Sequence, residues 1–475
     1  MVQRGGRSPS ELLVRGARSE TRWLAGWIGL SSVILFGCSS VRHLLFQSTA
    51  FDLGYFDQAT YLISQGQVPI VSFWGFHFLG GHADWIMYPI ALLYRLVPSV
   101  FWLLEIQAIA LALGALPTYF LGLQAGVKPR QALAIAGAYL LYPLIFNLNL
   151  FDFHPEVIAL PLILAAIWAA RQQHLLGFVV CVVISLGCRD ALSLTIAAMG
   201  LWLGLFERRR LYGAIALLLG VAWFLLATQW LIPQFRPAGV ESVTRFAYLG
   251  ATLPKILVNL ILKPQVVLSA LFTVKNLEYL VLLFAPLAWG LSWRHLAPLV
   301  AAIPPLAMNL LSTMDSQKDL LHQYSLPILP FMVVAAIAAV ANQHSLLQNP
   351  RRIWLWALVG FLALAKFGYF GDRYLNALDT WQATRTALTQ AQPTGSILTT
   401  AWIVPHVTHR PTVKVTMTGT ETTDLGQFDH VLLNLRHPGW MSTPETQRTL
   451  LTKLEQDSRF TRTFAQDDVY LFMRR

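Results

Sequence analysis

The sequence predicts an all-α polytopic membrane bundle that carries a small α/β domain outside the membrane. The chain has 475 residues, of which 55% are hydrophobic and only 12% charged, and its mean hydropathy is +0.52. Soluble domains contain roughly 25% charged residues. Apolar runs recur over residues 23–370, whereas residues 371–475 are polar. The net charge is +11, but the Lys and Arg residues fall in short clusters between apolar runs, which is the distribution of membrane topology signals. We therefore expect no nucleic-acid binding.

Eleven apolar runs are candidates for membrane crossings. Several contain nearer to 15 than to the usual ~20 residues, so their ends must extend into flanking polar residues or lie in a thinned or protein-lined region. The runs cover residues 23–46, 99–123, 131–150, 156–170, 174–188, 191–206, 210–232, 276–292, 295–312, 325–342 and 353–370.

The distribution of basic residues predicts how these runs are oriented. Residues 1–22 form a basic tail with five arginines, which places the N-terminus in the cytoplasm. With eleven crossings every predicted cytoplasmic loop is basic, and the long first outside loop, residues 47–98, has no Lys or Arg before Arg95. The C-terminal domain, residues 371–475, then lies outside.

Two further apolar stretches are predicted to be helices that lie in the outer interface or re-enter from it. Residues 85–97 are too few to span and contain Pro89 and Arg95. Residues 253–273 are interrupted by Lys263-Pro264. If one of the two crossed the membrane, every later loop would change sides and the basic-loop pattern would be inverted.

The polar C-terminal segment predicts strands around one helix. Thr443 followed by Pro444 is typical of a helix N-cap and first turn, and Leu450, Leu451 and Leu454 then form one apolar stripe. The strand-like runs are residues 395–404, 412–418, 429–435 and 469–473.

Polar residues that are unusual for a membrane protein converge on the outside in this topology. Each has a simpler explanation, because loop aspartates commonly cap helices. Arg189-Asp190 is the exception, since its turn between two apolar helices is so short that the pair should lie near the hydrocarbon boundary. The candidate residues are Asp52, Asp57, His77, His82, Asp84, Asp152, His154, Glu156, Arg189, Asp190, His322 and Tyr324.

Carboxylates, cations and aromatic rings together indicate a carbohydrate or lipid-headgroup site. A carboxylate can deprotonate an acceptor hydroxyl as it attacks a sugar carbon whose leaving group is a lipid phosphate. The leaving phosphate then needs cationic donors or a metal. Arg189, His322, Tyr324 and the basic residues between 236 and 263 are candidates for that role, although no spacing is diagnostic of a metal site.

The order of several short motifs resembles a bacterial family of multi-pass membrane proteins of unknown function that is grouped with the GT-C glycosyltransferases. The motifs are FDLGYFDQ at 51–58, GHADWIMYPIALLY at 81–94 with LLEIQAIALALGALPTYFLG at 103–122, FDFHPEVIALPLILAA at 151–166, the Arg189-Asp190 turn, QYSLPILPF at 323–331, WIVPHVTHRPTV at 402–413 and FDHVLLNLRHPGW at 428–440. They extend over nearly the whole chain.

The resemblance implies a GT-C-like transmembrane domain over residues 23–370 and a glycosyltransferase of the bacterial inner membrane. Its donor would be a polyprenyl-phosphate-linked sugar, and its acceptor a glycan, a lipid or a protein; membrane lipids surround it. Asp52 matches the position of the family's catalytic base, with Asp57 in reserve. A divalent cation, Mg or Mn, would be held by Asp190 and Asp152, but Arg189 departs from the family pattern, so Asp190 either binds a metal or pairs with that arginine.

Two other function classes stay open. A transporter or lipid flippase also needs many spans, but transporters commonly carry ionisable groups near the midplane and show internal repeats. Here the acidic groups collect at helix ends on one side, with Glu105 and Lys366 as exceptions, and no repeat is evident. A non-catalytic envelope assembly protein would bind a partner through its C-terminal domain. That domain contains His406, His409 and His437, but in strand-rich surroundings such histidines more often stabilise the fold than bind a ligand.

Overall fold

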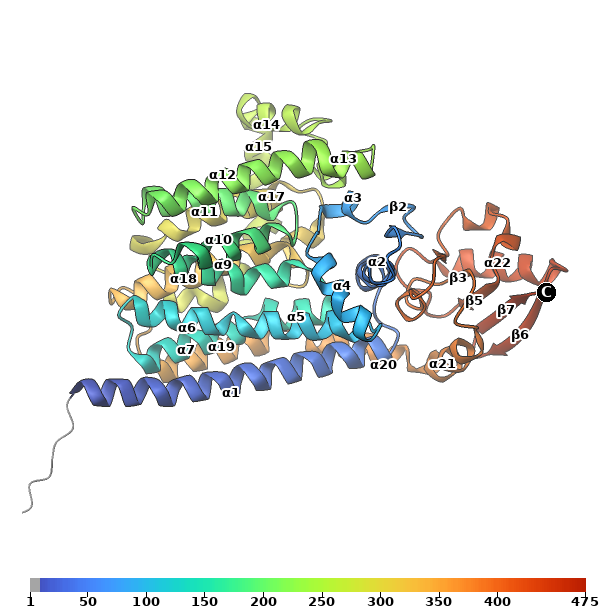
Figure 1. Cartoon of the computed structure of the whole chain (residues 1–475), viewed down its shortest axis with the longest axis horizontal. Coiled ribbons are helices and arrows are strands. Elements are labelled where there is room, and N and C mark those ends of the chain that lie inside the picture. The colour runs from blue at the N-terminus through green and yellow to red at the C-terminus, as the bar shows by residue number, and fades with distance from the viewer. Residues whose placement is uncertain (1–8) are drawn as a thin grey trace, which may run out of the picture.

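Helices dominate the computed structural model, which describes residues 9–475, with side chains from residue 19 onward. Figure 1 shows the long helices side by side in one bundle and a five-stranded sheet at the far end, next to the C-terminus. The predicted class, a helical bundle with a small C-terminal α/β part, is confirmed. Residues 1–8 of the predicted basic tail lie outside the described residues.

Each of the eleven predicted runs contains helix, and several runs are interrupted once. The helices of the bundle are α1 (Pro9–Leu44), α5 (Phe101–Leu113), α6 (Ala115–Gln124), α7 (Pro129–Leu140), α8 (Pro143–Phe151), α9 (Glu156–Arg171), α10 (Leu175–Leu186), α11 (Leu192–Leu205), α12 (Arg210–Leu226), α13 (Ile232–Phe235), α16 (Val274–Phe284), α17 (Ile303–Leu311), α18 (Leu329–Ala341), α19 (Pro350–Leu364) and α20 (Phe367–Asn376).

By length and composition, six helices among the described residues are able to cross a membrane, or up to seven if one bent pair is counted. Three of the predicted runs form shorter apolar helices, at Leu175–Leu186, Leu192–Leu205 and Ala297–Leu311. The expectation that some runs are short is confirmed, and the number of crossings stays a prediction. The bent pair is α14 (Leu253–Leu262) and α15 (Pro264–Leu271), which meet at 93°. The break predicted at Lys263-Pro264 is therefore confirmed.

Small residues bring two helices of the bundle into close contact. Gly200 of α11 faces Gly213 of α12, where an added Cβ would lie only 2.7 Å from the Gly200 carbonyl oxygen. A Cβ on Gly220 would lie 2.6 Å from the Ala197 nitrogen. Such contacts are typical of membrane helices, which associate through close packing rather than through the hydrophobic effect.

The first outside loop folds into short elements between the bundle and the C-terminal domain (Figure 1). It begins with a π-helical turn, η1 (Ala50–Gly54), and α2 (Tyr55–Ser64) follows directly. The other elements are β1 (Ile70–Val71), β2 (Phe76–His77), α3 (Leu79–His82) and α4 (Met87–Leu96). The loop contacts both neighbours, since the Ala50 amide donates to the Ala401 carbonyl over 3.0 Å.

The C-terminal domain is a mixed sheet with the strand order β4-β3-β5-β7-β6, in which β3 pairs in parallel with β4 and β5. The predicted helix is α22, and the Thr443 side chain accepts from the Thr446 amide, as the cap prediction requires. The elements are α21 (Trp381–Gln390), β3 (Ile397–Thr399), β4 (Val413–Val415), β5 (His430–Asn434), α22 (Pro444–Gln456), β6 (Phe460–Gln466) and β7 (Val469–Arg474).

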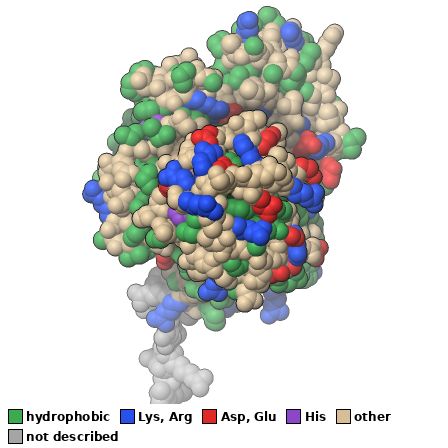
Figure 2. Space-filling view, turned by 90° about the vertical axis from the view of Figure 1, so that its right-hand side faces the viewer, with side chains coloured by type: hydrophobic (Ala, Val, Ile, Leu, Met, Phe, Trp, Pro, Cys, Tyr) green, Lys and Arg blue, Asp and Glu red, His purple; other side chains and the backbone are tan. Residues whose placement is uncertain are grey.

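The surface of the C-terminal domain differs from that of the bundle. Figure 2 faces this domain and shows basic and acidic side chains intermixed across it. Among the described residues beyond 380, only Trp440 and Met441 are exposed large hydrophobic side chains, whereas many such residues lie on bundle helices such as α1, α12 and α19. This contrast fits a domain in water attached to a bundle in lipid.

Candidate active site

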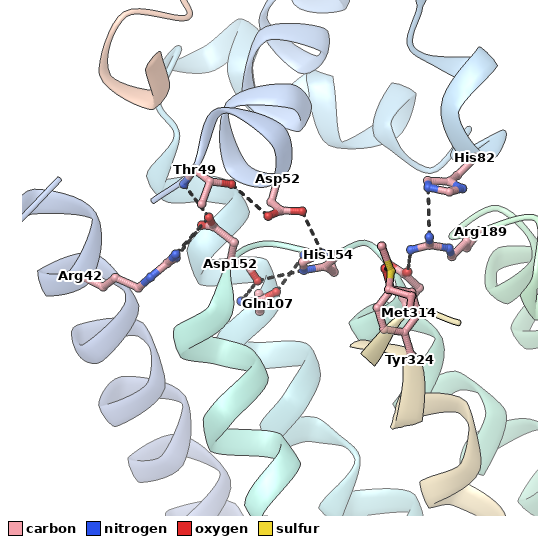
Figure 3. A network of polar contacts seen from close by, with 11 residues as sticks. Arg42, Thr49, Asp52, His82, Gln107, Asp152, His154, Arg189, Met314 and Tyr324 are labelled. Atoms are coloured by element: carbon pink, nitrogen blue, oxygen red, sulfur yellow. Dashed lines mark hydrogen bonds and ion pairs between the residues drawn. The ribbon is translucent and has the colours of Figure 1, made fainter. Parts of the chain in front are cut away.

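A buried ion pair anchors the first part of the site to the end of α1. Arg42 donates two hydrogen bonds to Asp152, over 2.6 and 3.1 Å, and the two side chains are only 4% and 0% exposed. The Thr49 amide donates to the same carboxylate over 2.8 Å. Asp152 therefore joins α1, the start of the first outside loop and the end of α8 at one point (Figure 3).

Asp52 lies in the π-helical turn η1, where two neighbours orient its carboxylate. The Thr49 hydroxyl donates to Oδ2 over 2.9 Å, and Nε2 of His154 lies 3.3 Å from Oδ1. The Asp52 side chain remains 25% exposed, so its carboxylate can still meet a ligand. His154 is held in turn by Gln107, whose Oε1 accepts from the His154 amide and whose Nε2 donates to the Asp152 carbonyl, both over 3.0 Å.

The Asp52–His154 contact changes the acidity of both groups. Burial raises the pKa of the Asp52 carboxyl, but the hydrogen bonds and charge of His154, with help from Thr49, outweigh burial and hold that pKa below its usual value. Burial lowers the pKa of His154, and Asp52 more than offsets it, so the pKa lies above its usual value. Asp52 is therefore ionised at neutral pH beside an imidazole that favours its protonated form.

A second group lies around Arg189, in the turn between α10 and α11. The guanidinium forms an ion pair with Glu156 and lies 3.0 Å from Nε2 of His82, and the other ring nitrogen of His82 lies 3.3 Å from Asp190. The two groups are neighbours, because His154 and Glu156 flank one proline and the charges of Glu156 and Arg189 both act on His154. In Figure 3, His154 lies between Asp52 and Arg189.

A pocket opens beside Arg189. The Tyr324 ring forms part of its wall between two cations, with the Arg245 guanidinium carbon 5.2 Å and that of Arg189 6.0 Å from the ring centroid. Arg245 has no acidic partner among the described residues, so its charge faces the pocket uncompensated. A pocket with one paired and one unpaired arginine suits an anionic ligand.

Asp84 is buried beside this group with neither carboxylate oxygen hydrogen-bonded to another described residue. Burial raises the pKa of Asp84 well above its usual range, and the charge of Glu156 raises it further. The protonated, neutral form of Asp84 is therefore favoured. A neutral Asp84 adds no second negative charge beside Glu156, which is already paired with Arg189.

Two other candidates, His322 and His77, lie at the edges of these groups. His322 accepts or donates to Asp319 over 2.7 Å and its ring contacts Phe151 at 4.3 Å, next to Asp152 in the chain. His77 stacks on Phe235 at 4.1 Å, and its Nδ1 accepts from the Leu79 amide, so its described contacts serve the fold of the loop.

Asp57 is placed differently from Asp52 and faces the C-terminal domain. Its carboxylate is 1% exposed and accepts from the Tyr94 hydroxyl over 2.6 Å and from the Thr408 hydroxyl, while His409 lies 3.2 Å away. Gln58 and Ser72 add further bonds to the same segment, at Arg410 and Val413. The described contacts of Asp57 therefore join the loop to the C-terminal domain.

We expect Asp57→Asn to weaken this junction by about 1–3 kcal/mol, because hydrogen bonds to a charged acceptor are replaced by weaker ones. Faster hydrogen exchange in β4 and in residues 404–412, relative to the wild type, would report it. Asp379→Asn is the matched control, since Asp379 is 44% exposed in its pair with Arg436 and we expect an effect of about 0–1 kcal/mol there. Equal exchange in the two variants would contradict the role given to Asp57.

The residues predicted to hold a divalent cation do not fit one in this arrangement. Among the side chains of residues 19–475, no three His, Cys, Asp or Glu are grouped so that they could hold a metal ion. Arg42 donates to both oxygens of Asp152, and the other predicted ligand, Asp190, lies 3.3 Å from Nδ1 of His82. No step below runs through a metal.

Arg42, Thr49 and Gln107 were not predicted. Arg42 and Gln107 are polar residues inside otherwise apolar runs, and that isolation is the sequence signal that marks them. Thr49 gives no such signal. Glu105 and Lys366, which a transporter would use within its spans, contribute no side chain to either group in the part of the chain that the structure describes.

The fold is similar to that of a solved membrane protein. The crystal structure of ArnT from Cupriavidus metallidurans bound to undecaprenyl phosphate matches with a TM-score of 0.56 at 12% identity, over 94% of this chain and 98% of that one. The apo structure of the same protein matches with a TM-score of 0.44, also at 12% identity, over 96% and 98%. The match with a TM-score of 0.56 shows that the chain has an ArnT-like fold. No curated protein matches the chain by sequence.

The order of motifs, the helical bundle and the C-terminal sheet agree with one family. Its sequence profile matches residues 42–471, from the arginine at the end of α1 to the last strand, β7. The chain belongs to the family of predicted membrane proteins known as DUF2079.

Proposed function

We propose that this protein is a glycosyltransferase that moves a sugar from a polyprenyl-phosphate carrier to an acceptor on the extracytoplasmic face of the membrane. One observation carries the proposal: an ionised, partly exposed Asp52 contacts His154, and the charges of Glu156 and Arg189, which line the neighbouring pocket, act on the same histidine. The likeness to ArnT, crystallised with undecaprenyl phosphate, supports a lipid phosphate as the ligand.

Asp52 acts as the general base in this proposal. One carboxylate oxygen takes the proton of the acceptor hydroxyl as the acceptor oxygen forms a bond to the anomeric carbon. The bond from that carbon to the phosphate oxygen breaks, and its electron pair leaves with the phosphate. Asp52 can act as the base in spite of its low pKa, because the acceptor hydroxyl becomes strongly acidic once its oxygen bonds to the anomeric carbon. The proton is therefore transferred late, after the bond to the leaving phosphate has lengthened. Thr49 and His154 fix the carboxylate and keep it charged.

Arg189 and Arg245 receive the negative charge that develops on the leaving phosphate. Both guanidinium groups flank Tyr324 at the pocket, and only Arg189 is already paired with a carboxylate. Arg245 is therefore the freer phosphate donor, while Glu156 holds Arg189 in place. The prenyl chain stays in the bilayer along the helices, and the acceptor approaches from the side of the C-terminal domain.

We expect Arg245→Gln to raise the KM for the lipid-linked donor about 10- to 100-fold, because a charge-assisted hydrogen bond to phosphate contributes about 1.5–3 kcal/mol. Initial rates at varied donor concentration in proteoliposomes would measure it. Lys255→Gln is the control, an exposed cation in the same basic stretch that does not line the pocket. An unchanged KM in Arg245→Gln would remove this arginine from donor binding.

The proposed activity is tested by reconstituting the full chain with a panel of polyprenyl-phosphate sugars labelled in the sugar. A membrane fraction from the producing cell supplies acceptors. Transfer of label with release of polyprenyl phosphate, dependent on the protein, is the expected result. Transport of label across the vesicle membrane without release of polyprenyl phosphate would instead identify a flippase.

A further inference from the structure

A second polar pocket lies where the C-terminal domain meets the bundle. Its empty volume is about 710 Å³, and it shares no lining residue with the pocket at Arg189. The end of α1, the turn before α5 and the segment Pro405–Arg410 enclose it. The function proposed above makes no use of it.

Arg410 is the unusual residue of this pocket. Its side chain is buried, with the whole residue 5% exposed, and Nη1 has no hydrogen-bond partner. No carboxylate among the described residues forms an ion pair with Arg410. Asp57 lines the same pocket, but its contacts are with Tyr94, Thr408 and His409. A buried guanidinium without an anion is costly, and proteins rarely keep one unless a counter-charge is supplied.

Two histidines that line the same pocket have buried nitrogens without a described partner. The rings of His43 and His406 stack at 4.0 Å, and neither Nδ1 of His43 nor Nε2 of His406 has a partner among the described residues. Burial lowers the pKa of His406 to about 4, so this ring is neutral at neutral pH. The ring also bonds to the His43 backbone, which uses its one N–H, so the free Nε2 of neutral His406 is an acceptor and does not donate to an anion.

We propose that this pocket binds an anionic oxygen group, a phosphate or a carboxylate, through the guanidinium of Arg410. The group supplies the counter-charge that the protein itself does not provide. Its source is either a soluble anion, such as a phosphorylated or acidic acceptor, or the headgroup of an anionic lipid at the outer surface. Both present the same oxygens to the arginine.

Arg410→Gln separates ligand binding from a structural role. Because Arg410 has no partner within the protein, removing its charge should leave the unfolding midpoint unchanged or higher when no anion is added. Full-length protein in an uncharged maltoside detergent is unfolded thermally and followed by tryptophan fluorescence. Inorganic phosphate and acetate are titrated at constant ionic strength against chloride. Phosphatidylglycerol in the micelle, with phosphatidylcholine as the neutral lipid, forms the third arm.

We expect at least one of the three anions to raise the wild-type midpoint saturably, by about 2 °C or more, and Arg410→Gln to remove that rise. Binding at Arg245 contributes equally to both proteins, so the difference between them reports Arg410. Arg448→Gln, an exposed arginine of α22, should respond as the wild type does. Phosphate or acetate as the active arm identifies a soluble ligand, and phosphatidylglycerol alone identifies a lipid.

Two results would overturn the proposal. One is an equal response of wild type and Arg410→Gln to all three anions. The other is a lower midpoint of Arg410→Gln in chloride alone, which would mean that the arginine stabilises the protein without a ligand. Neither result depends on glycosyl transfer, so this test of anion binding and the test of the proposed enzyme activity are independent of each other.

Discussion

Replacing Asp52 by Asn is expected to lower the rate constant for sugar transfer by about 10²–10⁴-fold, the usual contribution of a general base. The amide keeps the size and the Thr49 contact of the carboxylate but cannot take a proton from the acceptor. Binding of the lipid-linked donor depends on Arg189 and Arg245 at the pocket beside Tyr324, so the KM for the donor should stay close to that of the wild type. Single-turnover transfer at saturating donor would measure the loss.

Asp372→Asn is the control for this variant, because Asp372 is an exposed aspartate of α20 that belongs to neither polar group. It should transfer sugar at the wild-type rate. The thermal midpoint of Asp52→Asn should be checked alongside, since the carboxylate also bonds to His154. A folded Asp52→Asn protein with undiminished turnover would show that another group removes the proton.

Breaking the Arg42–Asp152 pair is expected to cause the largest loss of stability, about 3–5 kcal/mol for Asp152→Leu, because the buried guanidinium of Arg42 is left without its anion. The Thr49 amide also loses its acceptor. Denaturant unfolding in detergent, followed by tryptophan fluorescence, would measure the change.

The double variant Arg42→Met, Asp152→Leu tests the reason for that loss. If the cost comes from the unpaired charge, removing both charges should recover much of the stability. Glu241→Gln provides the comparison at an exposed pair, since Glu241 is 52% exposed where it contacts Arg236, and we expect a change of about 0–1 kcal/mol. A double variant as unstable as Asp152→Leu would show that shape rather than charge dominates at this point.

Hydropathy and local chemistry predicted much of this architecture. The apolar runs became helices, the Lys263-Pro264 step became a sharp bend, and Thr443-Pro444 became the start of α22. These features depend on neighbours within a few residues, which a single sequence displays. The resemblance to a family of membrane proteins rested on the order of several short motifs rather than on any one of them, and the fold is ArnT-like.

Strand β6 was not predicted, because its sequence lacks the usual signs of a strand. Phe460 is its only fully buried residue, so no alternating pattern is visible. It joins β7 through Asp467 and Asp468, both at positive φ (49° and 59°), where the sequence offers no glycine to mark the turn. An exposed edge strand with an unusual hairpin turn leaves little trace in the sequence.

The grouping of the candidate residues was harder to predict, because it depends on contacts between distant parts of the chain. Asp52 and Asp57 lie five positions apart and look alike in the sequence, yet one bonds to His154 and the other to Thr408 and His409. Arg42 and Asp152 are likewise 110 positions apart. One chain shows which residues are unusual but not which of them meet.

The most direct test of the central claim is a structure of the protein in a lipid nanodisc with a non-hydrolysable polyprenyl-phosphate sugar. We predict that the phosphate lies within hydrogen-bond distance of Arg245 or Arg189, beside Tyr324, with the anomeric carbon on the side of Asp52. A phosphate bound away from this pocket, with the sugar beyond the reach of any hydroxyl that contacts Asp52, would contradict the account.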